Sequence, residues 1–131
     1  MRDVHHRNTR NIFALGLRIG VSDIERSHRW YKDVLGFHME MADDGLSSVH
    51  QIELVDGSVI PVFWLVPAKD HAIGTGGISL VCHVGQLGPI IDDLRAAGVT
   101  IASEPVLRPG TAVPSAVILD PDGHQIVLVG N

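Results

Sequence analysis

An internal repeat is the feature that most constrains what this chain can fold into. Two apolar, strand-like segments end at Val21 and Val84, which are 63 positions apart. Each is followed by a helical pattern that ends at a glycine, Gly36 in the first half and Gly98 in the second, 62 positions apart. A glycine readily adopts the left-handed conformation that ends many helices. The matching spacings predict two similar units in tandem.

Each unit is predicted to have the element order βαβββ, which places the chain in the α+β class. Module one covers about residues 12–66 and module two about residues 77–130, with a linker at about 67–76. A unit of roughly 60 residues buries too little apolar surface to be comfortably stable alone, so we expect a single domain over residues 1–131. The predicted strands lie at about 12–21, 37–42, 47–55, 59–66, 78–84, 99–103, 112–119 and 124–130.

Two helices are predicted, at about 24–35 and 87–97. In the first, Ser22 and Glu25 form the pattern of a capping box, with Ser22 as the expected N-cap. In the second, apolar residues recur at the spacing of one helix face: Leu87, Ile90, Ile91 and Leu94.

Composition narrows the possible partners. The formal net charge of −5 disfavours non-specific binding to nucleic acid. Hydrophobic residues make up 45% of the chain and the mean hydropathy is +0.21, so we expect a core and a further apolar interface, as in a homodimer. A single cysteine excludes an intrachain disulfide and a cysteine-rich zinc site. The N-terminus is polar and no apolar run reaches the ~20 residues of a membrane helix, so we expect a cytoplasmic protein that does not bind membranes.

Sequence motifs in both halves of the chain carry a resemblance to a known family. VSDIERS at 21–27 runs into WYKDVLGF at 30–37, and the second half contains LRAAGV at 94–99 and DPDGH at 120–124. In this order the motifs closely resemble the vicinal oxygen chelate superfamily, which includes glyoxalases, bleomycin-resistance proteins and extradiol dioxygenases. The resemblance implies two βαβββ modules that form a curled mixed sheet around a cavity, with the helices outside.

Metal-dependent members of that superfamily hold a divalent ion with side chains from the first and last strands of each module. The positions that the resemblance assigns here are Gly16, Ser79 and Val127, and a fourth in the strand around 62–65, whose register is open. None except the serine carries an oxygen or nitrogen ligand. Glu53 is an alternative candidate, but we expect it in the third strand of module one. We therefore predict no metal ion and no cofactor.

Strand alternation then indicates which other side chains share the cavity. If Gly16 and Ser79 point inward, Arg18, His83 and Gln125 do so as well, together with either Trp64 or Phe63. The predicted ligand-binding residues are Arg18, Trp64, Ser79, His83 and Gln125, whereas no catalytic residue is assigned. The opposite set is apolar and is expected to face the helices: Leu17, Ile19, Leu80, Cys82, Val84, Ile126 and Leu128.

Each polar candidate also has a purely structural interpretation. Arg18 could form an ion pair with a carboxylate, and His83 could be a half-buried histidine whose hydrogen bonds are satisfied within the protein. Trp30 and Tyr31, on the first helix, are expected to serve packing.

The resemblance and the residues together favour a metal-independent small-molecule binding protein, of the kind that sequesters an antibiotic or related metabolite. The alternative is a glyoxalase-type lyase or isomerase, or a dioxygenase-like enzyme, with a rearranged or metal-free site. A weaker third hypothesis is a structural or regulatory domain with a closed cavity. Pairing of the modules within one chain and swapped pairing between two chains both fit the sequence.

Overall fold

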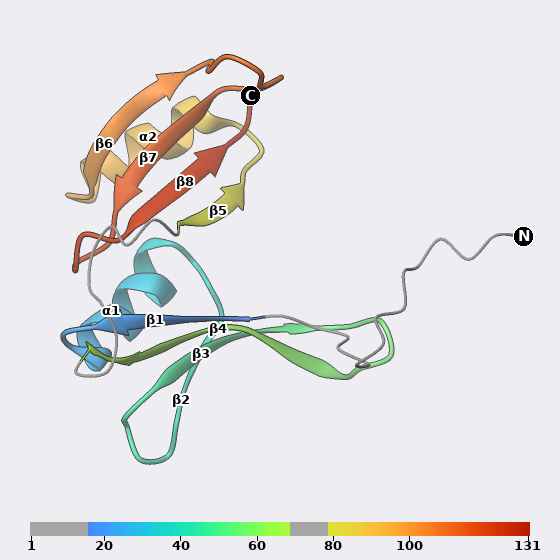
Figure 1. Cartoon of the computed structure of the whole chain (residues 1–131), viewed down its shortest axis with the longest axis vertical. Helices are drawn as coiled ribbons and strands as arrows, with labels where there is room; N and C mark the ends of the chain where they lie inside the picture. The colour runs from blue at the N-terminus through green and yellow to red at the C-terminus, as the bar shows by residue number, and fades with distance from the viewer. Residues whose placement is uncertain (1–15, 69–78) are drawn as a thin grey trace, which may run out of the picture.

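The computed structural model describes residues 16–68 and 79–131, which form two four-stranded sheets with helices against them (Figure 1). The strand orders are β1-β4-β3-β2 and β5-β8-β7-β6. This topological repeat confirms the α+β class and the two βαβββ units. The expected linker lies largely outside the described residues, as does the first part of the strand expected from residue 12.

In the first module, one parallel pair is extended by two antiparallel pairs. β1 runs parallel to β4, β4 is antiparallel to β3, and β3 is antiparallel to β2. A helical segment between the first two strands packs against one face of the sheet. The bounds are β1 Leu17–Val21, α1 Ile24–Arg29, η1 Trp30–Val34, β2 Met39–Met41, β3 Ser48–Glu53 and β4 Val59–Pro67.

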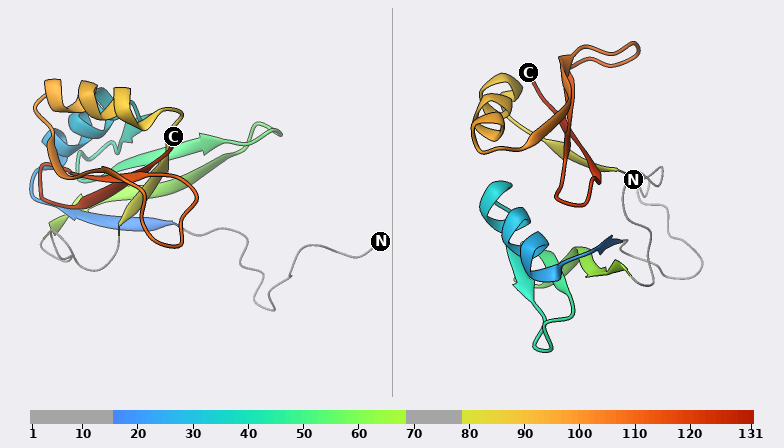
Figure 2. Two further views of the ribbon diagram at one scale, coloured as in Figure 1. Left: turned by 90° about the horizontal axis from the view of Figure 1, so that it is seen from above. Right: turned by 90° about the vertical axis from the view of Figure 1, so that its left-hand side faces the viewer.

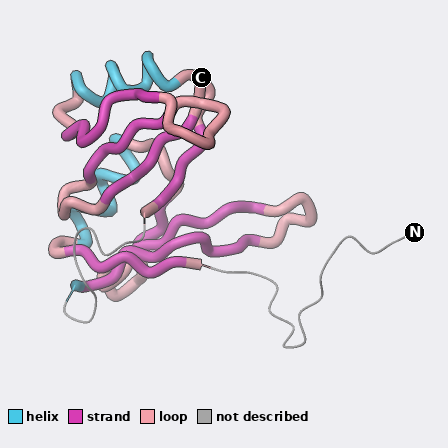
Figure 3. The backbone as a smooth tube through the Cα atoms, turned by 45° about the horizontal axis from the view of Figure 1, so that its top comes forward, coloured by secondary structure: helices cyan, strands magenta, loops and turns pink. Residues whose placement is uncertain are grey.

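The second module repeats this pattern. β5 runs parallel to β8, and β7 is antiparallel to both β8 and β6. The bounds are β5 Leu80–His83, α2 Leu87–Ala96, β6 Thr100–Val106, β7 Ser115–Leu119 and β8 Gln125–Val129. Figure 3 shows the strands of both modules and the longer β3–β4 hairpin, which projects from the first. No helix in the described ranges is long and apolar enough to cross a membrane.

The first helix differs from its prediction at both ends. Its N-cap is Asp23, whose carboxylate accepts the Arg26 backbone N–H at 3.0 Å, so the assignment of Ser22 was wrong. Ser22 is instead engaged by the second module, where its hydroxyl donates to Asp122 at 2.6 Å. The helix then widens into a π-helical turn, in which the Leu35 N–H donates to the Trp30 carbonyl.

The core confirms the predicted alternation of faces. Ile126 and Leu128 are buried, and the other predicted helix-facing residues pack against the core: Leu17, Ile19, Leu80, Cys82 and Val84. Tyr31 is fully buried, and Trp30 packs against its ring edge-on at 5.0 Å between centroids, which supports a packing role for both. Phe63 and Leu65 also belong to the core, which fixes the register of β4.

The helical side of module one faces module two. In Figures 1 and 2, α1 lies between the first sheet and the second module. Hydrogen bonds tie the two modules there: Tyr31 donates to Asp120, and the His124 imidazole Nε2 lies 2.7 Å from the Gly20 carbonyl oxygen. The opposite face of the first sheet therefore points away from the second module.

Candidate functional site

A row of side chains crosses the face of the first sheet that the helices leave open. Arg18 is the register partner of Trp64, Trp64 of Val49, and Val49 of Glu40. Aligned residues on neighbouring strands point to the same side of a sheet. Because Phe63, next to Trp64, is buried against the helices, this row lies on the other face. Trp64, and not Phe63, is therefore the aromatic residue on the open face.

Gly16 and Trp64 together exclude the first family-type metal ligand. A Cβ placed on Gly16 would lie 2.8 Å from Cζ3 of Trp64 and 3.1 Å from the Val62 carbonyl oxygen. The indole therefore occupies the space that a side chain at position 16 would need. At this position the open face offers an aromatic surface and no nitrogen or oxygen ligand.

Arg18 is exposed on that face beside the indole. It forms no hydrogen bond or ion pair with any residue in the described ranges, so the carboxylate partner of the purely structural interpretation is not seen there. Its guanidinium can donate two parallel hydrogen bonds to a carboxylate or phosphate. Glu40, at the far end of the row, is the acidic counterpart and accepts a hydrogen bond from His38 at 3.0 Å.

The remaining predicted site residues lie on the second sheet. His83 is exposed at the end of β5 and is the register partner of Val129, and Gln125 starts β8 opposite Leu119. Ser79 immediately precedes β5 and is half-buried. Alternation places the three on the face opposite Ile126 and Leu128.

The structure thus places Arg18 beside Trp64 on the first sheet. The other predicted site residues belong to the second module: Ser79, His83 and Gln125. The open face of the first sheet points away from module two (Figure 2), whereas His83 and Gln125 belong to strands of the second sheet. Sequence periodicity could find which side chains share a sheet face, but not which faces oppose each other.

The residues present do not fit a family-type metal site. Gly16 and Val127 have no ligand atom, and the fourth strand position is occupied by Trp64 and its apolar neighbours. Glu53 ends β3, the third strand of module one, as expected. Within residues 16–68 and 79–131, no three His, Cys, Asp or Glu side chains cluster as a divalent ion would require.

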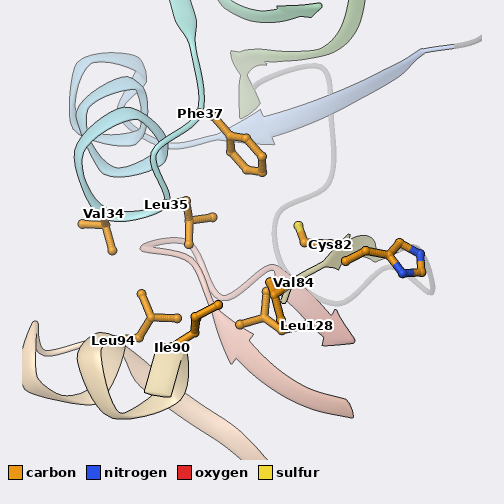
Figure 4. A pocket seen from close by; sticks show the side chains of 9 residues that line it. Val34, Leu35, Phe37, Cys82, Val84, Ile90, Leu94 and Leu128 are labelled. Atoms are coloured by element: carbon orange, nitrogen blue, oxygen red, sulfur yellow. The ribbon is translucent and has the colours of Figure 1, made fainter. Parts of the chain in front are cut away.

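A cavity of about 310 Å³ between the modules was missed by sequence reasoning (Figure 4). Its walls are Val34, Leu35 and Phe37 from module one, and Cys82, His83, Val84, Ile90, Leu94 and Leu128 from module two. Of these residues, alternation correctly assigns Cys82, Val84 and Leu128 to the helix-facing side. The sequence carried no signal for the space itself, because it arises where two modules meet.

Comparison with known proteins identifies the family. The profile of the Glyoxalase/Bleomycin resistance protein/Dioxygenase superfamily matches residues 13–128. The "Probable lactoylglutathione lyase" of Synechocystis is 26% identical over 125 residues, which cover 90% of this chain and 95% of that protein. "Glyoxalase domain-containing protein 4" of Rattus norvegicus is 28% identical over 121 residues, covering 90% of this chain, which spans only 41% of that relative.

Solved structures share the fold. A hypothetical protein from S. aureus superposes with a TM-score of 0.69 at 20% identity, over 92% of this chain and 94% of that one. A glyoxalase-related enzyme from Fulvimarina pelagi gives 0.67 at 20% identity, over 92% and 89%. Since the family profile spans nearly the whole chain and the fold agrees, the protein belongs to the Glyoxalase/Bleomycin resistance protein/Dioxygenase superfamily.

Proposed function

We propose that the protein binds a small molecule without a metal ion, at the open face of the first sheet, and thereby sequesters an antibiotic or related metabolite. The observation that carries the proposal is the packing of Trp64 over Gly16 beside Arg18, which has no partner within residues 16–68 and 79–131. The first family metal position is filled by an aromatic ring, and a cation lies next to that ring. This combination suits a ligand with a flat apolar part and an anionic oxygen group.

The row of side chains from Arg18 to Glu40 also determines the orientation of the bound ligand. Arg18 and Glu40 are at opposite ends, on strands β1 and β2, which are separated by β4 and β3. Three strand spacings amount to roughly 14 Å. An anionic group is attracted by Arg18 and repelled by Glu40, so the ligand's aromatic part is expected on Trp64 with its anionic group toward β1.

A homodimer would complete this site. One chain leaves the row on Arg18 and Trp64 uncovered, whereas a second copy can oppose it with its own His83, Ser79 and Gln125. The apolar composition of the chain supports such an interface. Light scattering tests the dimer, and a mass of one chain at micromolar concentration would contradict it.

The binding test uses 2-naphthoate as the probe, with its methyl ester as the uncharged control. Arg18→Ala should weaken 2-naphthoate binding by about 1–3 kcal/mol, because a charge-assisted hydrogen bond is lost. The matched control is Arg29→Ala, since Arg29 is also exposed but lies on α1 near Glu25. Isothermal titration calorimetry measures both. Equal affinity of Arg18→Ala and the unmodified protein, with an intact circular dichroism spectrum, would overturn the proposal.

A second candidate is a metal-free or rearranged glyoxalase-type enzyme, which the relative named as a probable lactoylglutathione lyase favours. In that case His83, the exposed histidine of β5, is the candidate acid or base. His83→Ala would then lower turnover far more than substrate affinity. The assay is formation of lactoylglutathione, with and without added divalent ions, compared with His38→Ala, which removes another exposed histidine. Absence of turnover under both conditions would leave binding as the function.

A further inference from the structure

The cavity between the modules lies apart from the open face of the first sheet. Leu35 and Phe37 project into it from the end of the first helical segment, Ile90 and Leu94 from α2, and Val84 from the chain just after β5 (Figure 4). Its walls therefore come from both halves of the repeat. Clefts between units of a fold are common places for small-molecule sites.

The lining favours an uncharged ligand. Among the nine residues that form the wall, none is Lys, Arg, Asp or Glu, and seven are aliphatic or aromatic. The other two are Cys82 and His83. Burial raises the pKa of the Cys82 thiol above its ordinary value, so the thiol stays neutral at physiological pH. Transfer of a charged ligand group into such surroundings would cost its hydration without a compensating partner.

The size of the cavity sets the size of the ligand. An apolar cavity of about 150 Å³ in a protein takes up one benzene molecule. The present cavity, about 310 Å³, has twice that volume. It can therefore hold two fused or linked aromatic rings, and the Phe37 ring and the Cys82 sulfur offer contacts suited to such a molecule.

We propose that the cavity between the modules is a second binding site, which takes a neutral, apolar molecule of about two aromatic rings. This site lies apart from Arg18 and Trp64 and takes a ligand of different chemistry, although His83 lines this cavity as well. Because both modules contribute walls, an occupant stabilises the arrangement in which they pack together, and it raises the melting temperature of the chain.

The test uses 6-propionyl-2-(dimethylamino)naphthalene, an uncharged fluorophore with two fused aromatic rings that emits strongly in apolar surroundings. Titration of the full chain should give saturable binding. Leu35→Trp should weaken it by about tenfold or more, because the indole takes up space that the ligand needs. Leu46→Trp is the matched control, since Leu46 is 60% exposed in the same module and should leave binding unchanged. Arg18→Ala should also leave it unchanged, which separates this site from the proposed function.

The single cysteine gives a second measurement on the unmodified chain. Cys82 lines the cavity, so a saturating amount of the fluorophore should slow its reaction with a thiol reagent at least about fivefold, whereas 2-naphthoate should not. Mass spectrometry follows the labelling. Failure to bind the fluorophore, or binding that leaves the labelling rate of Cys82 unchanged, would overturn the proposal even if Leu35→Trp did not fold.

Discussion

Tyr31 donates a hydrogen bond of 2.7 Å from its hydroxyl to Oδ2 of Asp120, 89 positions later in the chain. Tyr31 is fully buried and Asp120 is only 5% exposed. The other carboxylate oxygen, Oδ1, accepts the backbone N–H groups of Asp122 and His124 at 2.9 and 2.8 Å. The bond therefore joins the helical segment of module one to the β7–β8 turn of module two.

Removal of this hydroxyl should destabilise the whole domain. Tyr31→Phe keeps the ring but leaves Oδ2 of Asp120 buried without its donor, and we expect the free energy of unfolding to fall by about 1.5–3 kcal/mol. Urea denaturation measures the change. The double variant Tyr31→Phe/Asp120→Ala should lose less free energy of unfolding than the two single variants lose in total. A loss equal to that total would show that the bond contributes nothing.

Alkaline pH should destabilise the chain through the same tyrosine. Burial first, and then Asp120, raises the pKa of Tyr31 far above its ordinary value of 10.0. Above about pH 10 the unfolded chain loses this proton while the folded chain keeps it, so stability is full below pH 10 and then falls by about 1.4 kcal/mol per pH unit. Tyr31 is the only tyrosine, so phenolate absorbance reports this group alone. It should appear only as the protein unfolds.

Cys82 provides the control for that titration. Burial raises its pKa as well, so its contribution to stability has the same sign and is lost above the ordinary value of 9.0. Cys82→Ala should remove the loss of stability that begins above pH 9. Tyr31→Phe should remove the loss that begins above pH 10. A phenolate signal at pH 10 in the folded chain would contradict the assignment.

Substitution of alanine at two glycine positions should change the stability of the protein in opposite directions. A Cβ on Gly130 would overlap the backbone carbonyl oxygen of Val84, so Gly130→Ala should cost about 1–3 kcal/mol of stability. A Cβ on Gly88, in the first turn of α2, meets nothing within 4 Å. Gly88→Ala should therefore stabilise by about 0.5–1 kcal/mol, because alanine favours a helix. Thermal denaturation of both variants checks the prediction. A higher melting temperature for Gly130→Ala and a lower one for Gly88→Ala would refute it.

Metal content tests the absence of a family-type site. After chelation and re-addition of Zn, Ni, Mn or Fe, elemental analysis should find less than one tightly bound ion per chain, because Gly16, Ser79 and Val127 offer one hydroxyl among them. His5 and His6, which lie outside the described residues, could bind metal weakly. A chain without residues 1–10 is therefore the control, and one tight ion in that chain would overturn the prediction.

The sequence alone determined the local periodicities of this protein. Alternation in β5 and β8 correctly assigned Cys82 and Leu128 to the helix side, and the spacing of Gly36 and Gly98 correctly implied the repeat. These patterns could be read because the side of a strand on which a residue lies depends on its nearest neighbours in the chain. The N-cap was mistaken at Ser22, because its hydroxyl bonds to Asp122, 100 positions away.

Only the tertiary structure decided how the modules meet. It placed Trp64 over Gly16 and Arg18 on the open face of the first sheet, and it formed the cavity beside Leu35. These outcomes depend on contacts between residues far apart in sequence, such as Tyr31 with Asp120. A hydrophobic pattern indicates which face a side chain takes, but two βαβββ modules with buried helical faces can pack in more than one way. The choice between those ways comes from the few hydrogen bonds and apolar contacts across the boundary.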